Sequence, residues 1–354
     1  MRRIAQHAGL PAAAVLAASL LTAGPAAAEE SVTMSNWGGA WSEAVIGAYN
    51  DPYTASRGVT VNMVDYNGGI AEIRAMVEAG NVTWDMVELI PGDAIRACDE
   101  GLLEEVEFSE EDYPRADFVE NSIFKCGMGT VSWSTAVAYR DDKFPGAAPV
   151  TIQDFWDLEK FPGKRGLRKV SEVNLEWALI ADGVAKEDVY DVLATPAGVD
   201  RAFASLDKIK DNAIWWEAGA QAPQILADGE VVMTSAYNGR IYNAWKNEKQ
   251  PFAIMWQTQI MDLSYMTVVK NAPNKANAIL YLMDLGTPEI QARITDFIAY
   301  GPIRYSAMEQ VAEEVRPHLP TYPDNFKHVL LFDFFFWADY KDELEERFAA
   351  WLAQ

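Results

Sequence analysis

Short apolar runs alternate with amphipathic stretches along the first hundred residues of the chain. The run Trp84–Ile90 ends at Pro91 and Gly92, which is typical of a buried strand followed by a turn, and Asp93 is predicted to cap the next helix. Strands that alternate with helices predict a mostly parallel sheet. The expected strands here are 31–35, 59–66 and 84–90, and the expected helices are 42–56 and 70–79.

The rest of the chain continues this alternation. A strand over 127–139 is followed by a segment rich in Pro, Gly and Ala, and we expect the first passage between two lobes near 140–150. The pattern favours two α/β lobes with several chain passages between them. The further predicted strands are 166–169, 214–217, 231–236, 252–256 and 266–269, and the further predicted helices are 175–182, 198–210, 221–228 and 275–285, with helix continuing to about 297 and a final amphipathic helix ending at 352.

The N-terminal residues have the pattern of a secretory signal. Arg2 and Arg3 precede an apolar run over 15–21, and Ala26–Ala28 form a small-residue cleavage site. The run is too short to span a bilayer, which takes about 20 apolar residues. We therefore expect residues 1–28 to be a signal peptide cleaved near Ala28, and the mature protein to be periplasmic.

Acidic residues outnumber basic ones by 52 to 29, which gives a formal net charge of −23. This excess disfavours nucleic acid and anionic lipid as partners, and its simplest role is solubility. The three histidines, His7, His318 and His328, are scattered, so neither a zinc site nor a Ser-His-Asp triad is expected. We predict no cofactor and no resident metal.

Motifs of the common enzyme classes are also missing from the sequence. It has no G-x-G-x-x-G, P-loop or G-x-S-x-G motif, and paired acidic residues such as Glu104-Glu105 fall in solvated contexts. A binding protein is therefore favoured over an enzyme, with a secreted hydrolase as a remote alternative. A metal-binding relative of the same fold would need a cluster of tyrosines, for which Tyr237, Tyr242 and Tyr265 are the candidates.

The two cysteines, Cys98 and Cys126, are predicted to form a disulfide, because an exported protein with an even cysteine count usually pairs them. The alternative is two buried thiols.

The first mature strand ends at Trp37, followed by Gly38 and Gly39. Ligands of open α/β sheets bind at the carboxyl ends of strands, so Trp37 would place a flat apolar surface at a binding site. Further aromatic residues lie at or near predicted element ends, among them Trp133, Tyr237 and Tyr300. Such residues suit a ligand with methylene groups and a cationic amine.

An ordered series of short motifs resembles the periplasmic solute-binding proteins of ABC importers, in the branch that binds spermidine and putrescine. The series comprises Asn36-Trp-Gly38, Thr83-Trp-Asp-Met-Val87, Ala94–Leu103, Gly229–Met233, Ala236-Tyr-Asn-Gly-Arg240, Asn271–Ala278 and Tyr300-Gly-Pro302. The resemblance covers nearly the whole mature chain. It implies a type II-like, two-lobed periplasmic-binding-protein fold with mixed α/β sheets flanked by helices and a ligand cleft between the lobes.

The resemblance also implies lobe boundaries and partners. The first lobe would comprise 29–139 and about 263–306, and the second about 140–262 and 307–354. A monomer would deliver a small amine-bearing solute to the permease subunits of an ABC transporter.

By the same resemblance, the pocket positions fall on Trp37 with Gly38, Glu88 or Leu89, Glu172, Tyr237, Asp262 or Ser264, and Tyr300. The aromatic side chains would enclose an alkyl chain, and the acidic ones would hold amines by charge-assisted hydrogen bonds.

Two positions depart from the polyamine-binding pattern. After the turn Phe161-Pro-Gly-Lys164 the family has two carboxylates, whereas here only Glu172 is acidic, beside Arg168 and Lys169. Arg240 is the second departure, because a like charge in the cleft disfavours a dication, whereas a guanidinium pairs well with a carboxylate.

Arg240 together with Asp262 or Glu88 would describe an ω-amino acid such as γ-aminobutyric acid (GABA) instead of a polyamine. Other roles stay open at this point: a salt bridge for Arg240, a turn cap for Asp262, and core packing for Trp37 and Tyr237.

Overall fold

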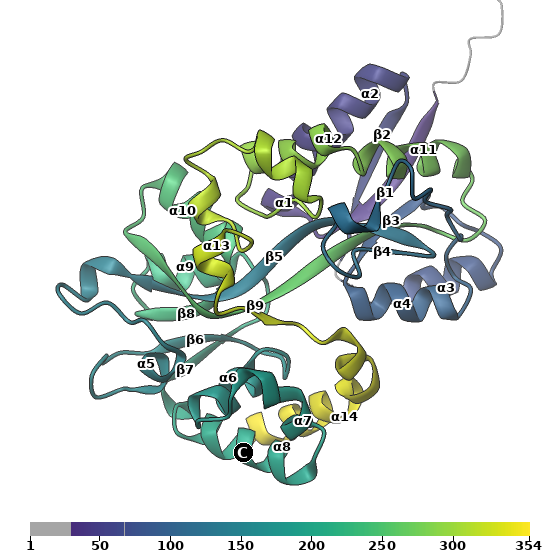
Figure 1. The fold of residues 1–354 in the computed structure, drawn as a ribbon. Coiled ribbons are helices and arrows are strands. Elements are labelled where there is room, and N and C mark those ends of the chain that lie inside the picture. The colour runs from purple at the N-terminus through teal and green to yellow at the C-terminus, as the bar shows by residue number, and fades with distance from the viewer. Residues whose placement is uncertain (1–29, 67) are drawn as a thin grey trace, which may run out of the picture.

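The computed structural model describes residues 30–66 and 68–354 (Figure 1), so the predicted signal peptide lies outside the described residues. The strands are β1 (Ser31–Asn36), β2 (Thr60–Asp65), β3 (Met86–Leu89), β4 (Ile123–Phe124), β5 (Gly127–Arg140), β6 (Arg165–Arg168), β7 (Ala213–Trp216), β8 (Met233–Tyr237), β9 (Phe252–Val268) and β10 (Leu330–Leu331).

The helices follow the same alternation. They are α1 (Gly39–Val45), α2 (Asp51–Arg57), α3 (Ala71–Glu78), α4 (Pro91–Asp99), α5 (Ile152–Trp156), α6 (Asn174–Ala181), α7 (Val189–Leu193), α8 (Pro196–Asp207), α9 (Gln221–Ala227), α10 (Asn238–Glu248), α11 (Lys275–Leu285), α12 (Pro288–Arg293), α13 (Pro323–Phe326) and α14 (Phe334–Leu352). A π-helical turn over Ile46–Asn50 joins α1 to α2.

Two predictions about local structure are wrong. The strands expected at 252–256 and 266–269 are one strand, β9, because Ile260–Tyr265 continue its pairing with β5 beyond an irregularity at 256–259. Asp93 does not cap α4, which begins at Pro91 with Ile90 at the N-cap position. Proline suits the first turn of a helix, where its missing N–H is not needed. The Asp93 side chain instead accepts a hydrogen bond from the Gly69 N–H over 3.2 Å.

The strands form one mixed sheet flanked by helices, in agreement with the expected fold class. The order along the sheet is β2-β1-β3-β9-β5-β8-β6-β7. Strands β1, β2 and β3 are mutually parallel, and so are β6, β7 and β8. The two groups are joined by the long antiparallel pair β5 and β9, which runs through the middle of the molecule (Figure 1).

Two main hydrophobic clusters divide the molecule into two lobes. Residues from 32–131 and 263–303 form the first cluster, and residues from 137–260 and 330–351 form the second. Val131 belongs to the first cluster and Val137 to the second. The first passage between the lobes therefore takes place inside β5, ahead of the predicted passage at 140–150.

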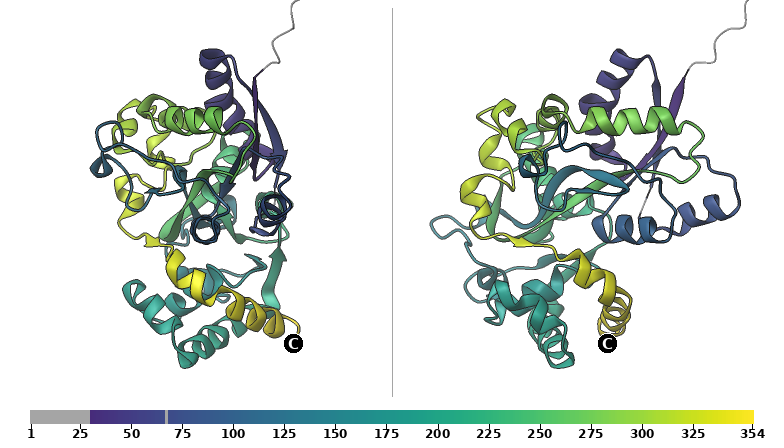
Figure 2. Two further views of the ribbon diagram at one scale, coloured as in Figure 1. Left: turned by 90° about the vertical axis from the view of Figure 1, so that its right-hand side faces the viewer. Right: turned by 45° about the vertical axis from the view of Figure 1, so that its right-hand side comes forward.

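The C-terminal helix α14 connects the lobes at one side of the molecule. It buries Phe336, Trp337 and Phe348 in the second cluster, and it also contacts α4 of the first lobe (Figure 2). This position brings one face of α14 to the junction of the lobes. In the part of the chain that the structure describes, no helix is long and apolar enough to cross a membrane.

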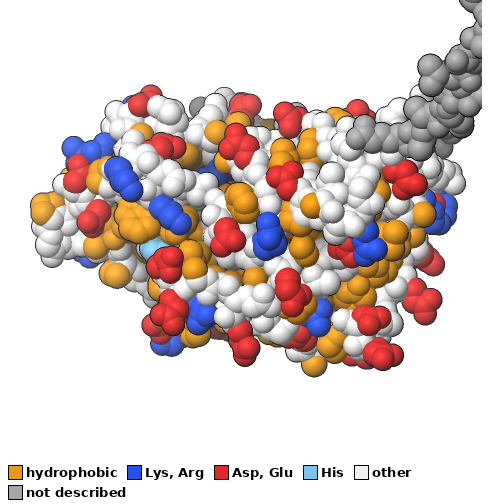
Figure 3. All heavy atoms as spheres, turned by 90° about the horizontal axis from the view of Figure 1, so that it is seen from above, with side chains coloured by type: hydrophobic (Ala, Val, Ile, Leu, Met, Phe, Trp, Pro, Cys, Tyr) orange, Lys and Arg blue, Asp and Glu red, His pale blue; other side chains and the backbone are white. Residues whose placement is uncertain are grey.

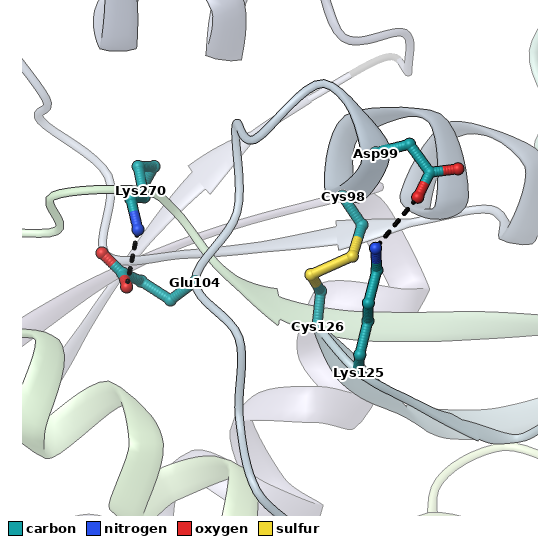
Figure 4. The surroundings of a disulfide bond; sticks show 6 residues. All are labelled: Cys98, Asp99, Glu104, Lys125, Cys126 and Lys270. Atoms are coloured by element: carbon teal, nitrogen blue, oxygen red, sulfur yellow. Dashed lines mark hydrogen bonds and ion pairs between the residues drawn. A yellow bond between two sulfur atoms is a disulfide. The ribbon is translucent and has the colours of Figure 1, made fainter.

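A disulfide joins Cys98 at the end of α4 to Cys126 just before β5 (Figure 4). The two cysteines are separated by 28 positions in the sequence, and closing a loop of that size stabilises a fold by roughly 3–4 kcal/mol in the chain-entropy model. The ion pairs of Lys125 with Asp99 and of Lys270 with Glu104 lie nearby.

On the face that Figure 3 shows, acidic side chains are spread among basic and apolar ones. This even distribution agrees with solubility as the main role of the negative net charge.

Candidate ligand-binding site

A cavity of about 480 Å³ lies between the lobes, at the carboxyl ends of both groups of parallel strands. Trp37 and Gly38 follow β1, Tyr66 follows β2, Arg168 ends β6 and Tyr237 ends β8. The carboxyl ends of parallel strands are where open α/β sheets bind ligands, and the volume is typical of a small-molecule site.

The two crossing strands form the floor of the cavity. Val131, Trp133 and Thr135 on β5 pair in register with Ser264, Asp262 and Ile260 on β9, and all six line the cavity. Because side chains of a strand alternate between the two faces, every second residue of each strand points into the same space. Asp262 therefore lies beside Trp133 in the middle of the floor.

The first lobe contributes an aromatic wall, formed by Trp37, Trp41, Tyr66 and Tyr300. The ring centroids of Trp37 and Tyr66 lie 5.7 Å apart, and those of Trp41 and Tyr300 also lie 5.7 Å apart. Tyr237 closes the wall from the second lobe. Such rings offer apolar contact to methylene groups and their electron-rich faces to a cation.

Gly38 makes the turn after β1 possible. Its φ of 67° lies in the left-handed region, and a Cβ at this position would come within 3.1 Å of the Asp65 carboxylate. Glycine is the residue that adopts this conformation without strain, so Gly38 allows the preceding Trp37 to turn into the cavity.

Glu88 lies behind the aromatic wall and does not line the cavity. It is fully buried, accepts a hydrogen bond from Trp41 Nε1 over 2.5 Å, and accepts one from Thr130 Oγ1 over 2.7 Å. Burial raises the pKa of Glu88 to about 7, while these two hydrogen bonds oppose the shift. Glu88 therefore positions Trp41 instead of facing a ligand.

Two arginines of the second lobe line the cavity, Arg168 at the end of β6 and Arg240 in the first turn of α10. Within residues 30–66 and 68–354, neither forms a salt bridge, and the Nε atom of each is buried without a hydrogen-bond partner. An unsatisfied buried donor is costly, so both guanidinium groups suit an anionic group brought by a ligand.

Asp262 is the most deeply buried carboxylate of the cavity, with 9% of its surface exposed. Its Oδ1 accepts a hydrogen bond from the Leu263 N–H over 2.7 Å. Burial raises the pKa of Asp262 to about 8, and the negative charge of Glu172 adds to the shift. A cationic amine placed beside Asp262 would favour the ionised carboxylate and so lower this pKa.

The remaining acidic groups of the cavity already face a cation. Glu172 Oε1 lies 2.8 Å from Lys341 Nζ, which reaches the cavity from α14. Glu217, at the rim, pairs with Lys169 over 2.9 Å. Burial raises the pKa of Asp93, and the positive charge of Lys341 opposes that shift. Asp262 is thus the carboxylate of the floor with no cationic side chain in salt-bridge contact among the described residues.

Seven of the eight residues predicted as ligand contacts line this one cavity, and Glu88 does not. The seven are Trp37, Gly38, Glu172, Tyr237, Arg240, Asp262 and Tyr300. Their contact with a ligand stays a prediction.

Three cavity residues, Trp41, Arg168 and Lys341, were not expected in the pocket from the sequence. Arg168 could have been found, because it lies at the end of the strand predicted over 166–169 and ligands bind at such ends. Lys341 has no comparable signal, since it lies on a helix far along the chain.

The tyrosines proposed for a metal site lie in different surroundings. Tyr237 lines the cavity, Tyr242 packs against His318 with ring centroids 4.9 Å apart, and the Tyr265 hydroxyl donates to the Asn121 carbonyl. Among the described residues, no group of three His, Cys, Asp or Glu side chains could hold a metal ion.

The chain matches the family model of the bacterial extracellular solute-binding proteins over residues 48–321. It is 44% identical over 328 residues to a γ-aminobutyric acid-binding protein of Pseudomonas aeruginosa, which covers 93% of this chain and 92% of that protein.

Solved structures agree with this match. An ABC transporter substrate-binding protein of Bradyrhizobium japonicum superimposes with a TM-score of 0.83 at 33% identity, covering 91% of this chain and 99% of that one. The structure of a GABA receptor superimposes with a TM-score of 0.81 at 29% identity, covering 92% and 98%. The family match, the two-lobed fold and the cavity between the lobes agree, and this chain belongs to the bacterial extracellular solute-binding proteins of ABC transporters.

Proposed function

We propose that this protein binds a GABA-like ω-amino acid in the periplasm and delivers it to the permease of an ABC importer. The observation that carries the proposal is the charge arrangement of the cavity: two arginines that pair with no carboxylate among the described residues, and one buried carboxylate, Asp262, line the same aromatic space.

The arginines would hold the ligand's carboxylate. Arg168 and Arg240 both come from the second lobe, and each guanidinium carries donors in a fixed planar fork that matches a carboxylate. A bound carboxylate would satisfy donors that are otherwise buried and unpartnered.

Asp262 would hold the ligand's amine. A cationic amine beside this carboxylate forms a charge-assisted hydrogen bond and supplies a counter-charge that the floor of the cavity lacks. The short aliphatic chain between the two ends would lie against Trp37 and Tyr237. The ligand then contacts both lobes, and contact with both lobes is what favours a closed conformation over an open one.

This charge arrangement supports an ω-amino acid over a polyamine, which the resemblance of short motifs favoured. A diamine needs an anionic anchor at each end, but Glu172 is already paired with Lys341, and two arginines face the same cavity. A like charge at close range opposes binding of a dication. The 44% identical relative is a GABA-binding protein, which supports the same choice.

Isothermal titration of the mature protein with GABA, putrescine and spermidine tests the proposal. We expect saturable binding of GABA and at least tenfold weaker binding of both polyamines. A thermal-shift measurement gives an independent readout, because ligand at 100 times its Kd adds about 2.7 kcal/mol of stability.

Tighter binding of putrescine or spermidine than of GABA would overturn the proposal. The variant Arg240→Ala removes one of the two groups that would hold the ligand's carboxylate and leaves Asp262 in place. If Arg240→Ala bound GABA as tightly as the wild type, the role given to Arg240 would be wrong.

A further inference from the structure

Lys341, on the C-terminal helix α14, places a positive charge beside acidic residues of the cavity. It lies on α14, one turn beyond the buried Trp337, and its Nζ lies 2.8 Å from Glu172 Oε1. Glu172 belongs to the loop after β6 in the second lobe, whereas Asp93, which also lines this part of the cavity, belongs to α4 of the first lobe.

The surroundings of Lys341 are those of a bound amine. Partial burial by itself lowers the pKa of Lys341, but the charges of Glu172, Asp93 and Glu345 outweigh this effect, so its pKa is raised and the ammonium is held charged. The Glu172 side chain is 12% exposed and the Lys341 side chain 40% exposed. Glu172 is thus the buried member of the pair, and Lys341 is the more exposed one.

We propose that Lys341 is a specificity-determining residue whose ammonium occupies the place where a diamine's second amine would pair with Glu172, restricting the cavity to ligands with one amine. This inference rests on the proposed function, in which Asp262 holds the amine of the ligand and the arginines hold its carboxylate.

The charge balance at two carboxylates would produce this selectivity. Asp262 and Glu172 both line the cavity, and each lies within the electrostatic field of the other. A diamine would pair one end with each of them if both were free. Because Lys341 already neutralises Glu172, a second ligand amine would have to displace an ammonium tethered to the protein. Discrimination of this kind depends on a repulsive group as much as on an attractive one.

Removal of the Lys341 charge should therefore open the cavity to diamines. In Lys341→Met, which keeps the alkyl length without the ammonium, Glu172 lacks its counter-ion. We expect the Kd of putrescine or cadaverine to fall at least tenfold relative to the wild type, and the Kd of GABA to change less than threefold. Two diamines are used so that a mismatch in amine spacing does not hide the gain.

Two control variants separate this role from a merely structural one. Lys341→Arg keeps a cation at the site and should show no gain of diamine binding. The double variant Glu172→Gln/Lys341→Met lacks both charges and should lose the gain seen in Lys341→Met. Thermal unfolding followed by circular dichroism confirms that each variant is folded.

Isothermal titration of all four proteins with GABA, putrescine and cadaverine decides the question. The proposal is overturned if folded Lys341→Met binds neither diamine more tightly than the wild type does, or if the double variant shows the same gain. Absence of GABA binding by the wild type would count against the proposed function alone, because the diamine comparison is made between wild type and variant.

Discussion

The two lobes contribute different chemistry to the cavity. The first lobe presents the rings of Trp37, Trp41, Tyr66 and Tyr300 and a single carboxylate, Asp93. The second lobe presents two rings, those of Tyr237 and Phe332, and most of the charged groups, which are Arg168, Glu172, Glu217, Arg240 and Lys341.

Because of this difference, the aromatic wall should contribute mainly to affinity, and the charged groups should select between ligands. An aromatic wall attracts any aliphatic chain that carries a cation and discriminates weakly between chain ends. Charged groups discriminate strongly, because a mismatched or unpaired charge in a partly dry site costs several kcal/mol. Asp262 on the crossing strand β9 lies between the walls. Changes at Asp262 and at the two arginines of the second lobe, Arg168 and Arg240, should therefore have the largest effects on GABA binding, and changes behind the aromatic wall the smallest.

The largest effect is expected for Asp262→Asn. Loss of the buried partner of a charged amine costs about 2–5 kcal/mol, so we expect the Kd of GABA to rise at least thirtyfold in isothermal titration. Ser264→Ala, two residues along the same face of β9, is the matched control and should change the Kd less than threefold. Equal losses in the two variants would contradict the role of Asp262.

Asp262→Asn should also stabilise the ligand-free protein at alkaline pH. The pKa of Asp262 is raised to about 8 in the fold, against about 3.9 in an unfolded chain. Between these values the native state holds an extra proton, so wild-type stability falls as pH rises from about 4 to about 8. We expect the melting temperature of Asp262→Asn to exceed that of the wild type at pH 8 by more than at pH 5.

The next largest effect is expected at the two arginines of the cavity. Arg168→Ala and Arg240→Ala each remove hydrogen bonds to a charged group, worth about 1.5–3 kcal/mol, so GABA binding should weaken by roughly 10- to 100-fold in each. Binding of putrescine should not weaken in either variant, because the removed charges repel a dication. A parallel loss of GABA and putrescine binding would show that these arginines maintain the shape of the cavity instead of selecting the ligand.

Most of the fold could be predicted from the pattern of the sequence. Both parallel groups follow from the alternation of short strand segments with helices along the chain. The continuity of β9 could not be predicted, since Asp262 and Ser264 interrupt its apolar run. Asp262 and Ser264 do so because they face the cavity, whereas Gln257, Thr258 and Gln259 also interrupt the run and do not line it. The failure of the pattern therefore falls only in part on the binding site.

The candidate site was predicted where it follows strand ends and missed where it depends on tertiary packing. Trp37, Tyr237 and Arg240 lie next to strand ends, which are visible in the sequence. Lys341 reaches the cavity only because α14 packs in the second lobe and also contacts α4, a contact between segments some 240 positions apart. A single sequence contains no signal for such a contact.

A smaller effect is expected on the aromatic wall. Trp37→Leu keeps an apolar side chain but removes the ring face, and a partly exposed contact of this kind is worth about 1 kcal/mol. We expect GABA binding to weaken by about three- to tenfold in isothermal titration, with a similar factor for putrescine. Trp245→Leu, on the exposed side of α10 and outside the cavity, serves as control and should bind like the wild type. A ligand-dependent loss in Trp37→Leu would mean that the aromatic wall also selects.

The smallest effect on affinity is expected behind that wall, at Glu88. Glu88→Gln retains an oxygen that can accept the Trp41 Nε1 hydrogen bond, and Thr130 can accept from the new amide. Trp41 should therefore keep its position, and the Kd of GABA should change less than threefold.

What Glu88→Gln should change is the pH dependence of stability. Burial raises the pKa of Glu88 to about 7, against about 4.3 when unfolded, so the native state holds an extra proton between these values and stability falls as pH rises through this range, by up to about 1.4 kcal/mol per pH unit. Removing the titrating group should flatten the melting-temperature profile between pH 5 and pH 7.

Glu176→Gln is the matched variant in the second lobe. Glu176 is also fully buried and accepts a hydrogen bond from Trp337 Nε1, and burial raises its pKa to about 7. Both variants should flatten the profile while leaving GABA binding nearly intact, and a profile parallel to that of the wild type would show that these carboxyl groups stay ionised in the fold.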